Sequence, residues 1–205
     1  FDAALPDEHR SRNNQLLWHA MAQVEPALSA ACRCFGPDRI GVVLGTSTSG
    51  VDENLPAFRH IADGGQWQDS AFSQAHQLLC SPVDFIQAQY GLSGIGYAIS
   101  TACTSGARAL ASAARLLKLG LCDAVLCGGF ASLEVVSGRV ARPFAADRDG
   151  INIGEAAAVF LMTRAPMPDF PEGEPIGLLG YGASSDAWHM SSPRPDGEGA
   201  MQAIQ

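Results

Sequence analysis

The junction between an apolar run and an alanine-rich segment constrains the fold of this chain more than any other feature. The run from Ile95 to Ser100 predicts a strand that is buried on both faces. The segment that follows, from Thr104 to Leu119, carries Ala and Leu at helical spacing and ends at Gly120, a typical residue to follow a helix. A buried strand that passes directly into a helix indicates an α/β domain.

Cys103 lies at this junction. We expect its thiol at the first turn of the helix, where unpaired N–H groups and the helix dipole favour an anion, and hence the nucleophilic thiolate. The same N–H groups could hold the oxyanion that forms when a thioester is attacked. The alternative is a small buried cysteine, but Thr104, Ser105 and Gly106 are too small and polar for ordinary core packing. The pattern therefore predicts a catalytic nucleophile at Cys103.

The composition excludes several classes of protein. A net charge of −8 argues against a nucleic-acid partner, which needs a broad basic face. No apolar stretch approaches the ~20 residues of a membrane span, and the segment Phe1–Pro6 lacks the basic start of a signal peptide. The six cysteines do not form the pattern of a disulfide framework. We therefore expect a reduced cytoplasmic protein that binds neither nucleic acid nor membrane.

Two short motifs suggest a ligand but lack its further requirements. Cys32 and Cys34 have no second pair of metal ligands nearby, so we expect no metal. The loop Gly45–Gly50 has the composition of a phosphate loop but lacks its Gly-Lys-Ser/Thr ending, which excludes nucleotide binding there.

Along the chain, apolar runs alternate with helical patterns, which predicts a mostly parallel, five-stranded sheet with helices on both faces. The last two strands have no helix between them and could form an antiparallel edge. Pro26 is expected to divide the first helix into two pieces. The expected helices are 12–34, 81–90 and 104–119, and the expected strands are 40–44, 95–100, 124–127, 156–163 and 176–182.

Five blocks of sequence, in the same order, resemble the β-ketoacyl-acyl-carrier-protein synthases of the thiolase superfamily. They are Thr101–Gly106, Arg142–Gly150, Gly154–Ala158, Gly180–Met190 and Gly197–Ala200. The resemblance runs from about Ser11 to the C-terminus. It is greatest to the elongating condensing enzymes, including relatives in polyketide and aryl-polyene pathways.

The resemblance implies a thiolase-like fold and a decarboxylative Claisen condensation. Cys103 would take an acyl chain from a thioester, and the carbanion formed from malonyl-carrier protein would attack it to give a 3-ketoacyl product. No resident cofactor is implied, because the phosphopantetheine arrives on the acyl carrier protein. The implied partners are that carrier protein and a second ketosynthase subunit, in a homodimer or a heterodimer.

Further site residues follow from the same resemblance. Ser191 matches a position that bonds the pantetheine arm, and Phe130 and Val51 resemble acyl-pocket positions, for which plain core packing is the alternative. His189 matches a histidine near the pantetheine entrance, outside the catalytic pair. Arg10 and Arg12 begin a segment that resembles the family's carrier-docking helix.

The chain also departs from the family pattern. The catalytic histidines of the family have no match here, so we expect residues 1–205 to be the N-terminal half of a ketosynthase domain, without its C-terminal half. The interval between Gly129 and Arg142 is short, which predicts a missing loop near 129–130. The block Asp147–Gly150 lacks the further oxygen ligands of a calcium loop and is interpreted as an ion-pair cluster.

Two other functions stay open at this point. A non-catalytic, chain-length-determining partner subunit would have the same fold, but such subunits typically replace the nucleophile that this chain keeps at Cys103. A degradative thiolase is less compatible with the Arg142–Gly150 and Gly180–Met190 blocks, which resemble synthases.

Overall fold

A computed structural model of the chain describes residues 5–131, 142, 144–146, 154–165, 167, 176–189 and 192–205. The chain divides into two compact units, Phe1–Pro171 and Glu172–Gln205. Cys103 and the whole described sheet belong to the first unit. Within the described parts of the chain, no helix combines the length and the apolar character that a membrane span requires.

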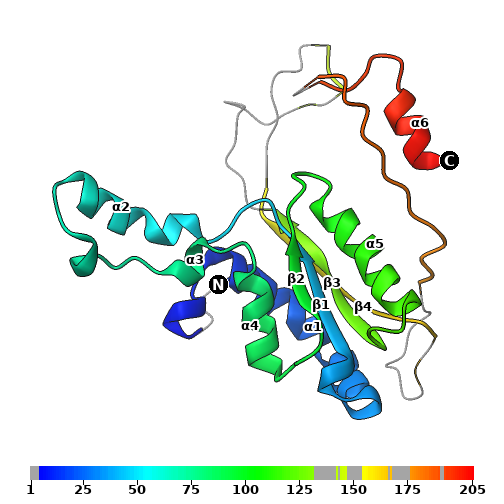
Figure 1. Cartoon of the computed structure of the whole chain (residues 1–205), viewed down its shortest axis with the longest axis horizontal. Helices are drawn as coiled ribbons and strands as arrows, with labels where there is room; N and C mark the ends of the chain where they lie inside the picture. The colour runs from blue at the N-terminus through cyan, green and yellow to red at the C-terminus, as the bar shows by residue number, and fades with distance from the viewer. Residues whose placement is uncertain are drawn as a thin grey trace. The chain divides into compact units, whose positions relative to one another are not determined.

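The sheet has the strand order β2-β1-β3-β4 (Figure 1). Its strands are β1 (Ile40–Gly45), β2 (Gly96–Ile99), β3 (Ala124–Ala131) and β4 (Ala156–Thr163). β1 pairs in parallel with both β2 and β3, whereas β4 pairs antiparallel with β3. The prediction of a mostly parallel α/β sheet is therefore confirmed.

The predicted fifth strand at 176–182 is wrong, because the described residues there join no ladder and the sheet has four strands. An apolar run reports only that a segment suits an extended conformation, and a strand also needs a neighbour to bond. The predicted antiparallel edge exists, but it is formed by β4 on β3 and not by the last two predicted strands.

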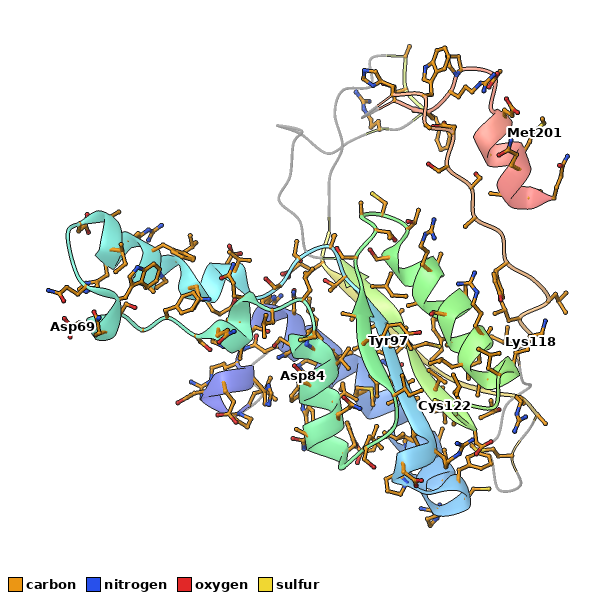
Figure 2. All side chains as sticks on the ribbon, viewed as in Figure 1. Asp69, Asp84, Tyr97, Lys118, Cys122 and Met201 are labelled. Atoms are coloured by element: carbon orange, nitrogen blue, oxygen red, sulfur yellow. The ribbon has the colours of Figure 1, made fainter. Side chains whose placement is uncertain are left out.

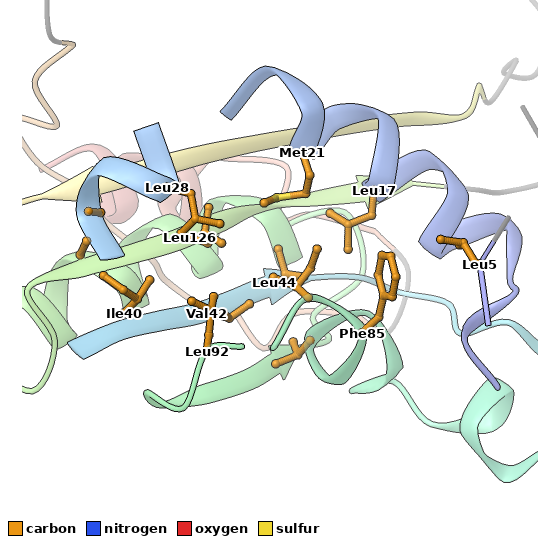
Figure 3. Packing of buried hydrophobic residues seen from close by; sticks show 14 of the residues in the cluster. Leu5, Leu17, Met21, Leu28, Ile40, Val42, Leu44, Phe85, Leu92 and Leu126 are labelled. Carbon is orange, nitrogen blue, oxygen red and sulfur yellow. The ribbon is translucent and has the colours of Figure 1, made fainter. Parts of the chain in front are cut away.

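Two helices cover one face of the sheet, namely α1 (Arg12–Phe35) and α4 (Ser81–Tyr90). Figure 3 shows Leu17, Met21 and Leu28 of α1 facing the apolar side chains of β1 and β3. Helix α5 (Ser105–Lys118) covers the other face. Successive residues of β1 serve the two layers in turn: Val42 and Leu44 pack under α1, and Val43 packs under α5. Helices on both faces are thus confirmed.

Helix α1 runs without a break past Pro26, so the predicted division is wrong. A proline removes the bond to the carbonyl of the residue four positions earlier, here Ala22. Both Ala22 and Pro26 are exposed, so water can bond that carbonyl. The helix begins after Ser11, whose Oγ accepts the Asn14 N–H at 3.2 Å, and it lies between the 3₁₀ turns η1 (Asp7–His9) and η2 (Pro37–Arg39).

The strand before Cys103 was expected to be buried on both faces, and this is also wrong. β2 is an edge strand, with Gly96 exposed and residues 97–99 half-buried. It is nevertheless fixed to α5, because the Tyr97 hydroxyl lies 2.6 Å from Ser112 Oγ. Figure 2 labels Tyr97 on this strand. An apolar run does not reveal whether a strand has one neighbour or two, and among the described residues this strand has one.

Residues 51–77, for which no element was predicted, form a lobe of short helices that extends away from the sheet (Figure 1). It contains η3 (Val51–Asn54), α2 (Leu55–Ala62), η4 (Trp67–Asp69) and α3 (Gln74–Gln77). Phe58, Trp67 and Phe72 pack edge to face, with ring centroids 5.5–6.0 Å apart. This aromatic contact holds the lobe together. The polar sequence of the segment shows no clear helical pattern, so its short helices were not predicted.

In the second unit, an extended segment at 176–189 precedes α6 (Glu198–Ile204). Asp186 organises the turn between them, since its carboxylate accepts the N–H groups of Arg194 at 2.9 Å and Trp188 at 3.2 Å. These bonds hold the pKa of Asp186 below its usual value. The hydroxyl of Ser184 also donates to the carbonyl of Gly199, which attaches the extended segment to the helix.

Candidate active site

Cys103 is exposed and lies on the short connection between β2 and α5. Thr104 is the N-cap of α5, so the thiol precedes the first helical turn by two residues and does not lie in it as expected. Ala102 has a φ of 52°, a left-handed conformation that non-glycine residues rarely adopt. The strained residue turns the chain sharply just before the cysteine.

The side chain of Ser105 fixes this turn with two hydrogen bonds. Its Oγ accepts the Thr101 N–H at 2.9 Å and donates to the Ala102 carbonyl at 2.6 Å. Because Ser105 is 4% exposed, these two bonds are shielded from water. The hydroxyl of Thr104 donates to the Thr101 carbonyl at 2.8 Å and does not cap the helix. The positive end of the α5 dipole therefore faces the connection that bears Cys103 without a side-chain cap.

Three glycines seat the start of α5 on the sheet. A methyl group on Gly45, the last residue of β1, would lie 2.5 Å from the Gly106 nitrogen and closer still to the Ser105 carbonyl group. A methyl group on Gly129 of β3 would lie 3.0 Å from Gly106 Cα. The helix thus rests directly on the main chain at the carboxyl ends of two parallel strands, where α/β sheets place their ligands.

The other cysteines have different surroundings. Burial raises the pKa of Cys127 to about 12, and burial also raises the pKa of Cys122 and Cys32. Cys34 is exposed and lines a pocket of about 480 Å³ with Asp123 and Arg164. Asp123 precedes β3, so that pocket lies at the opposite end of the parallel strands from Cys103. Within the described residues, His, Cys, Asp and Glu form no group of three that could hold a metal ion.

The remaining predicted residues are only partly placed. Val51 begins η3 and is 38% exposed, so it is not a core residue of this chain. Phe130 belongs to β3, opposite Ala157 of β4, and the structure describes its backbone but not its side chain. Ser191 and the Asp147–Gly150 block also lie outside them. β3 runs through 129–130, and the missing loop stays a prediction.

The two arginines of the expected docking segment differ. Arg10 pairs with Asp7 at 3.0 Å on the surface. Arg12 donates from Nε to both carboxylate oxygens of Glu155, at 2.9 and 3.1 Å, and this bond holds the pKa of Glu155 below its usual value. Sequence reasoning missed this pair, because 143 positions separate its members and no local pattern joins them.

The family described as "Beta-ketoacyl synthase, N-terminal domain" matches residues 14–166, about three quarters of the chain. The chain belongs to this family. The match includes the Cys103 turn and all four strands of this beta-ketoacyl synthase domain.

Individual relatives agree with this assignment. The "3-oxoacyl-[acyl-carrier-protein] synthase 2" of Rhizobium meliloti is 29% identical over 98% of the chain and 53% of its own length. The enzyme of the same name from Vibrio cholerae is 28% identical over 82% of the chain and 45% of its own length. The chain therefore spans about half the length of these curated relatives.

Solved structures show the same fold. A ketosynthase (ApeO) in complex with its chain length factor (ApeC), from Xenorhabdus doucetiae, is 39% identical, with a TM-score of 0.85 over 98% of this chain and 52% of that one. A beta-ketoacyl synthase from Burkholderia phymatum, 21% identical, has a TM-score of 0.77 and shows the fold alone. The predicted thiolase-like ketosynthase fold is thus confirmed.

Proposed function

We propose that the protein is a β-ketoacyl-acyl-carrier-protein synthase whose nucleophile is Cys103. The observation that carries the proposal is the exposed thiol beside the uncapped start of α5, on a turn fixed by Ser105 and seated by glycines. A nucleophile needs access to substrate and a fixed position, and this turn offers both.

In the proposed reaction, the Cys103 thiolate attacks the carbonyl carbon of an acyl thioester, and the carrier thiol leaves. Malonyl-carrier protein then loses CO₂, and the carbanion attacks the acyl group on Cys103, which releases the cysteine thiolate and a 3-ketoacyl-carrier protein. The start of α5 would stabilise the oxyanion of the first step. The histidines for decarboxylation would come from sequence beyond Gln205, with residues 1–205 as the N-terminal half.

The proposed substrate contacts are the residues that the resemblance to the family indicates. Val51 and Phe130 would line the acyl chain, and Ser191 would bond the pantetheine arm that the carrier protein brings, so that no resident cofactor is needed. The exposure of Val51 supports its role, because an apolar side chain at the surface of a loop gains from an apolar ligand.

The proposed partners are an acyl carrier protein and a second ketosynthase subunit, the same or related, in the cytoplasm. The open edge of β2 supports a dimer, because its outer main-chain groups have no neighbouring strand among the described residues. The names of relatives give further support: several are acyl-carrier-protein synthases, and one was solved with its chain length factor.

The test is intact-mass spectrometry of the full-length protein after incubation with a short acyl thioester. We expect one acyl adduct, which is lost in Cys103→Ser and kept in Cys34→Ser, the control at the other fully exposed cysteine. An adduct that persists in Cys103→Ser would refute the assignment of the nucleophile. A parent protein that stays unmodified, alone and with a partner ketosynthase that is acylated, would favour the chain-length-determining subunit instead.

A further inference from the structure

The 46–54 loop leads from the candidate active site into the lobe and ends with η3, the first element of the lobe; the start of α1 holds this loop. The backbone N–H of Arg12, the first residue of α1, donates to Glu53 Oε1 at 2.6 Å. The guanidinium of the same residue binds the Glu155 carboxylate, directly before β4. One residue therefore joins the loop to the sheet.

The two neighbours of Arg12 hold the same loop at two more points. Asn13, which is 3% exposed, donates from Nδ2 to the Thr48 carbonyl at 3.2 Å. Ser11 packs so tightly on Gly50 that a methyl group there would lie 2.8 Å from Ser11 Cβ. Three successive residues of one helix end thus contact three points spread along the loop.

The other end of this loop begins beside Cys103. Gly45, immediately before the loop, is seated against the first turn of α5. The N–H of Thr46 donates to the carbonyl of Ile99, the last residue of β2, at 2.9 Å. Because both flanks of the Cys103 connection contact this start of the loop, a displacement of the loop changes the space around the thiol.

Arg12 is the charged member of this set, and its side chain joins the start of α1 to the residue before β4. Its guanidinium binds Glu155 in a bidentate arrangement, with Nε donating to Oε1 and Nη2 to Oε2, which fixes direction as well as distance. The loop that these contacts hold exposes apolar Val51, at 38%, and is followed by apolar Leu55, at 41%.

We propose that Arg12 is a positioning residue that sets acyl-chain selectivity through the 46–54 loop, and that it does not serve as a contact for a carrier protein. The inference rests on the proposed transfer of acyl groups to Cys103. The Arg12 side chain is 40% exposed, but its charge is already engaged by Glu155, whereas a docking residue needs its charge available to an acidic partner.

The experiment compares Arg12→Gln with Arg33→Gln in the full-length protein. Arg33 is an exposed arginine on the last turn of the same helix, so the control removes the same charge without touching the loop. Each variant receives an equimolar mixture of short, medium and long acyl N-acetylcysteamine thioesters, and the adducts on Cys103 are counted by intact mass. We expect Arg12→Gln to change the ratio of long to short adducts by about tenfold, and Arg33→Gln to keep the parent ratio.

A second measurement uses the same acyl groups on an acyl carrier protein. A positioning role changes the ratio equally with carrier-bound and carrier-free donors. A docking role leaves the ratio unchanged and slows acylation only from the carrier protein, and this result would overturn the inference. A parent protein that forms no adduct with either donor refutes the proposed function itself, which is a separate result.

Two further variants distinguish positioning from general damage to the fold. Arg12→Glu combined with Glu155→Arg restores the pair in reverse, and we expect it to recover most of the parent ratio. Glu53→Gln weakens the contact between the loop and the backbone N–H of Arg12, and it should shift the ratio in the same direction as Arg12→Gln. If Glu53→Gln keeps the parent ratio while Arg12→Gln loses it, the effect does not pass through the loop and the inference is wrong.

Discussion

The contact between Gly45 and the start of α5 leads to a direct prediction for Gly45→Ala. The added methyl group would meet three main-chain atoms of Ser105 and Gly106 at 2.5 Å or less, whereas carbon contacts normally begin near ~3.5 Å. Neither backbone can rotate away as a side chain can, so α5 has to retreat by about 1 Å. We expect a loss of about 1–3 kcal/mol in the free energy of unfolding, as in overpacked cores.

The same retreat moves the turn that bears Cys103. A misplacement of about 1 Å reduces reaction rates by up to about a hundredfold, so we expect acylation of Cys103 to slow by about ten- to a hundredfold in Gly45→Ala. Denaturant unfolding measures the stability, and an intact-mass time course with a short acyl thioester measures the rate.

Gly106→Ala is the matched control for stability. It adds the same methyl group to the first turn of α5, where the nearest atom is Gly129 Cα at 3.9 Å and no atom of Gly45 lies within 4 Å. Because alanine favours helix, this variant should be unchanged or more stable by up to about 1 kcal/mol. If Gly45→Ala is as stable as the parent and is acylated at the same rate, α5 is not seated on β1 as described, and the reasoning fails.

Three further predictions concern single side chains. Ser105→Ala leaves the Thr101 N–H without its acceptor, so it should cost about 1–3 kcal/mol and slow acylation of Cys103, as denaturant unfolding and intact mass will show. Asp123→Asn should lower the unfolding midpoint near pH 7, because the Asp123 carboxylate accepts a hydrogen bond from Arg39 that lowers the pKa of Asp123 in the folded protein. The stabilisation by this carboxylate is complete above the unfolded pKa of about 3.9 and is lost as the pH falls through the folded pKa. The gap between parent and variant should therefore close on acidification. Iodoacetamide at pH 8 should modify Cys103 in the native protein and leave Cys127 unmodified, because burial raises the pKa of Cys127 to about 12; peptide mapping that finds Cys127 modified first would contradict this burial.

The sequence predicts those parts of the fold that depend on local pattern. Apolar runs located β1 and β4, and the helical spacing after Cys103 located α5 to within one residue at each end. The candidate nucleophile Cys103 was singled out in the same way, because a small polar stretch between a strand and a helix is a local feature, and its catalytic role stays a proposal. The family resemblance then supplied the reaction, which local pattern does not contain.

The sequence does not predict those parts that depend on distant neighbours. The run at 95–100 was expected to be buried on both faces, yet β2 is part-exposed and, in the described part of the chain, has a strand on one side only. Pro26 breaks no helix because its side of α1 faces water, a fact that no local rule provides. The pairing of Arg12 with Glu155 depends on the antiparallel course of β4, which brings the start of that strand to the carboxyl end of β3. Such contacts require the topology first.

The close main-chain contacts of Gly45, Gly106 and Gly129 beneath α5 also affect how sequences of this family can diverge. A core of side chains has many solutions of similar energy, so its residues can be exchanged step by step while the total volume is kept. A contact between two main chains needs glycine at the point of closest approach, and its geometry does not depend on which apolar residues fill the layers on either side. The position of Cys103 is therefore decoupled from the composition of the core. Sequences can drift through most of the sheet and its helices while the thiol stays at the same point in space.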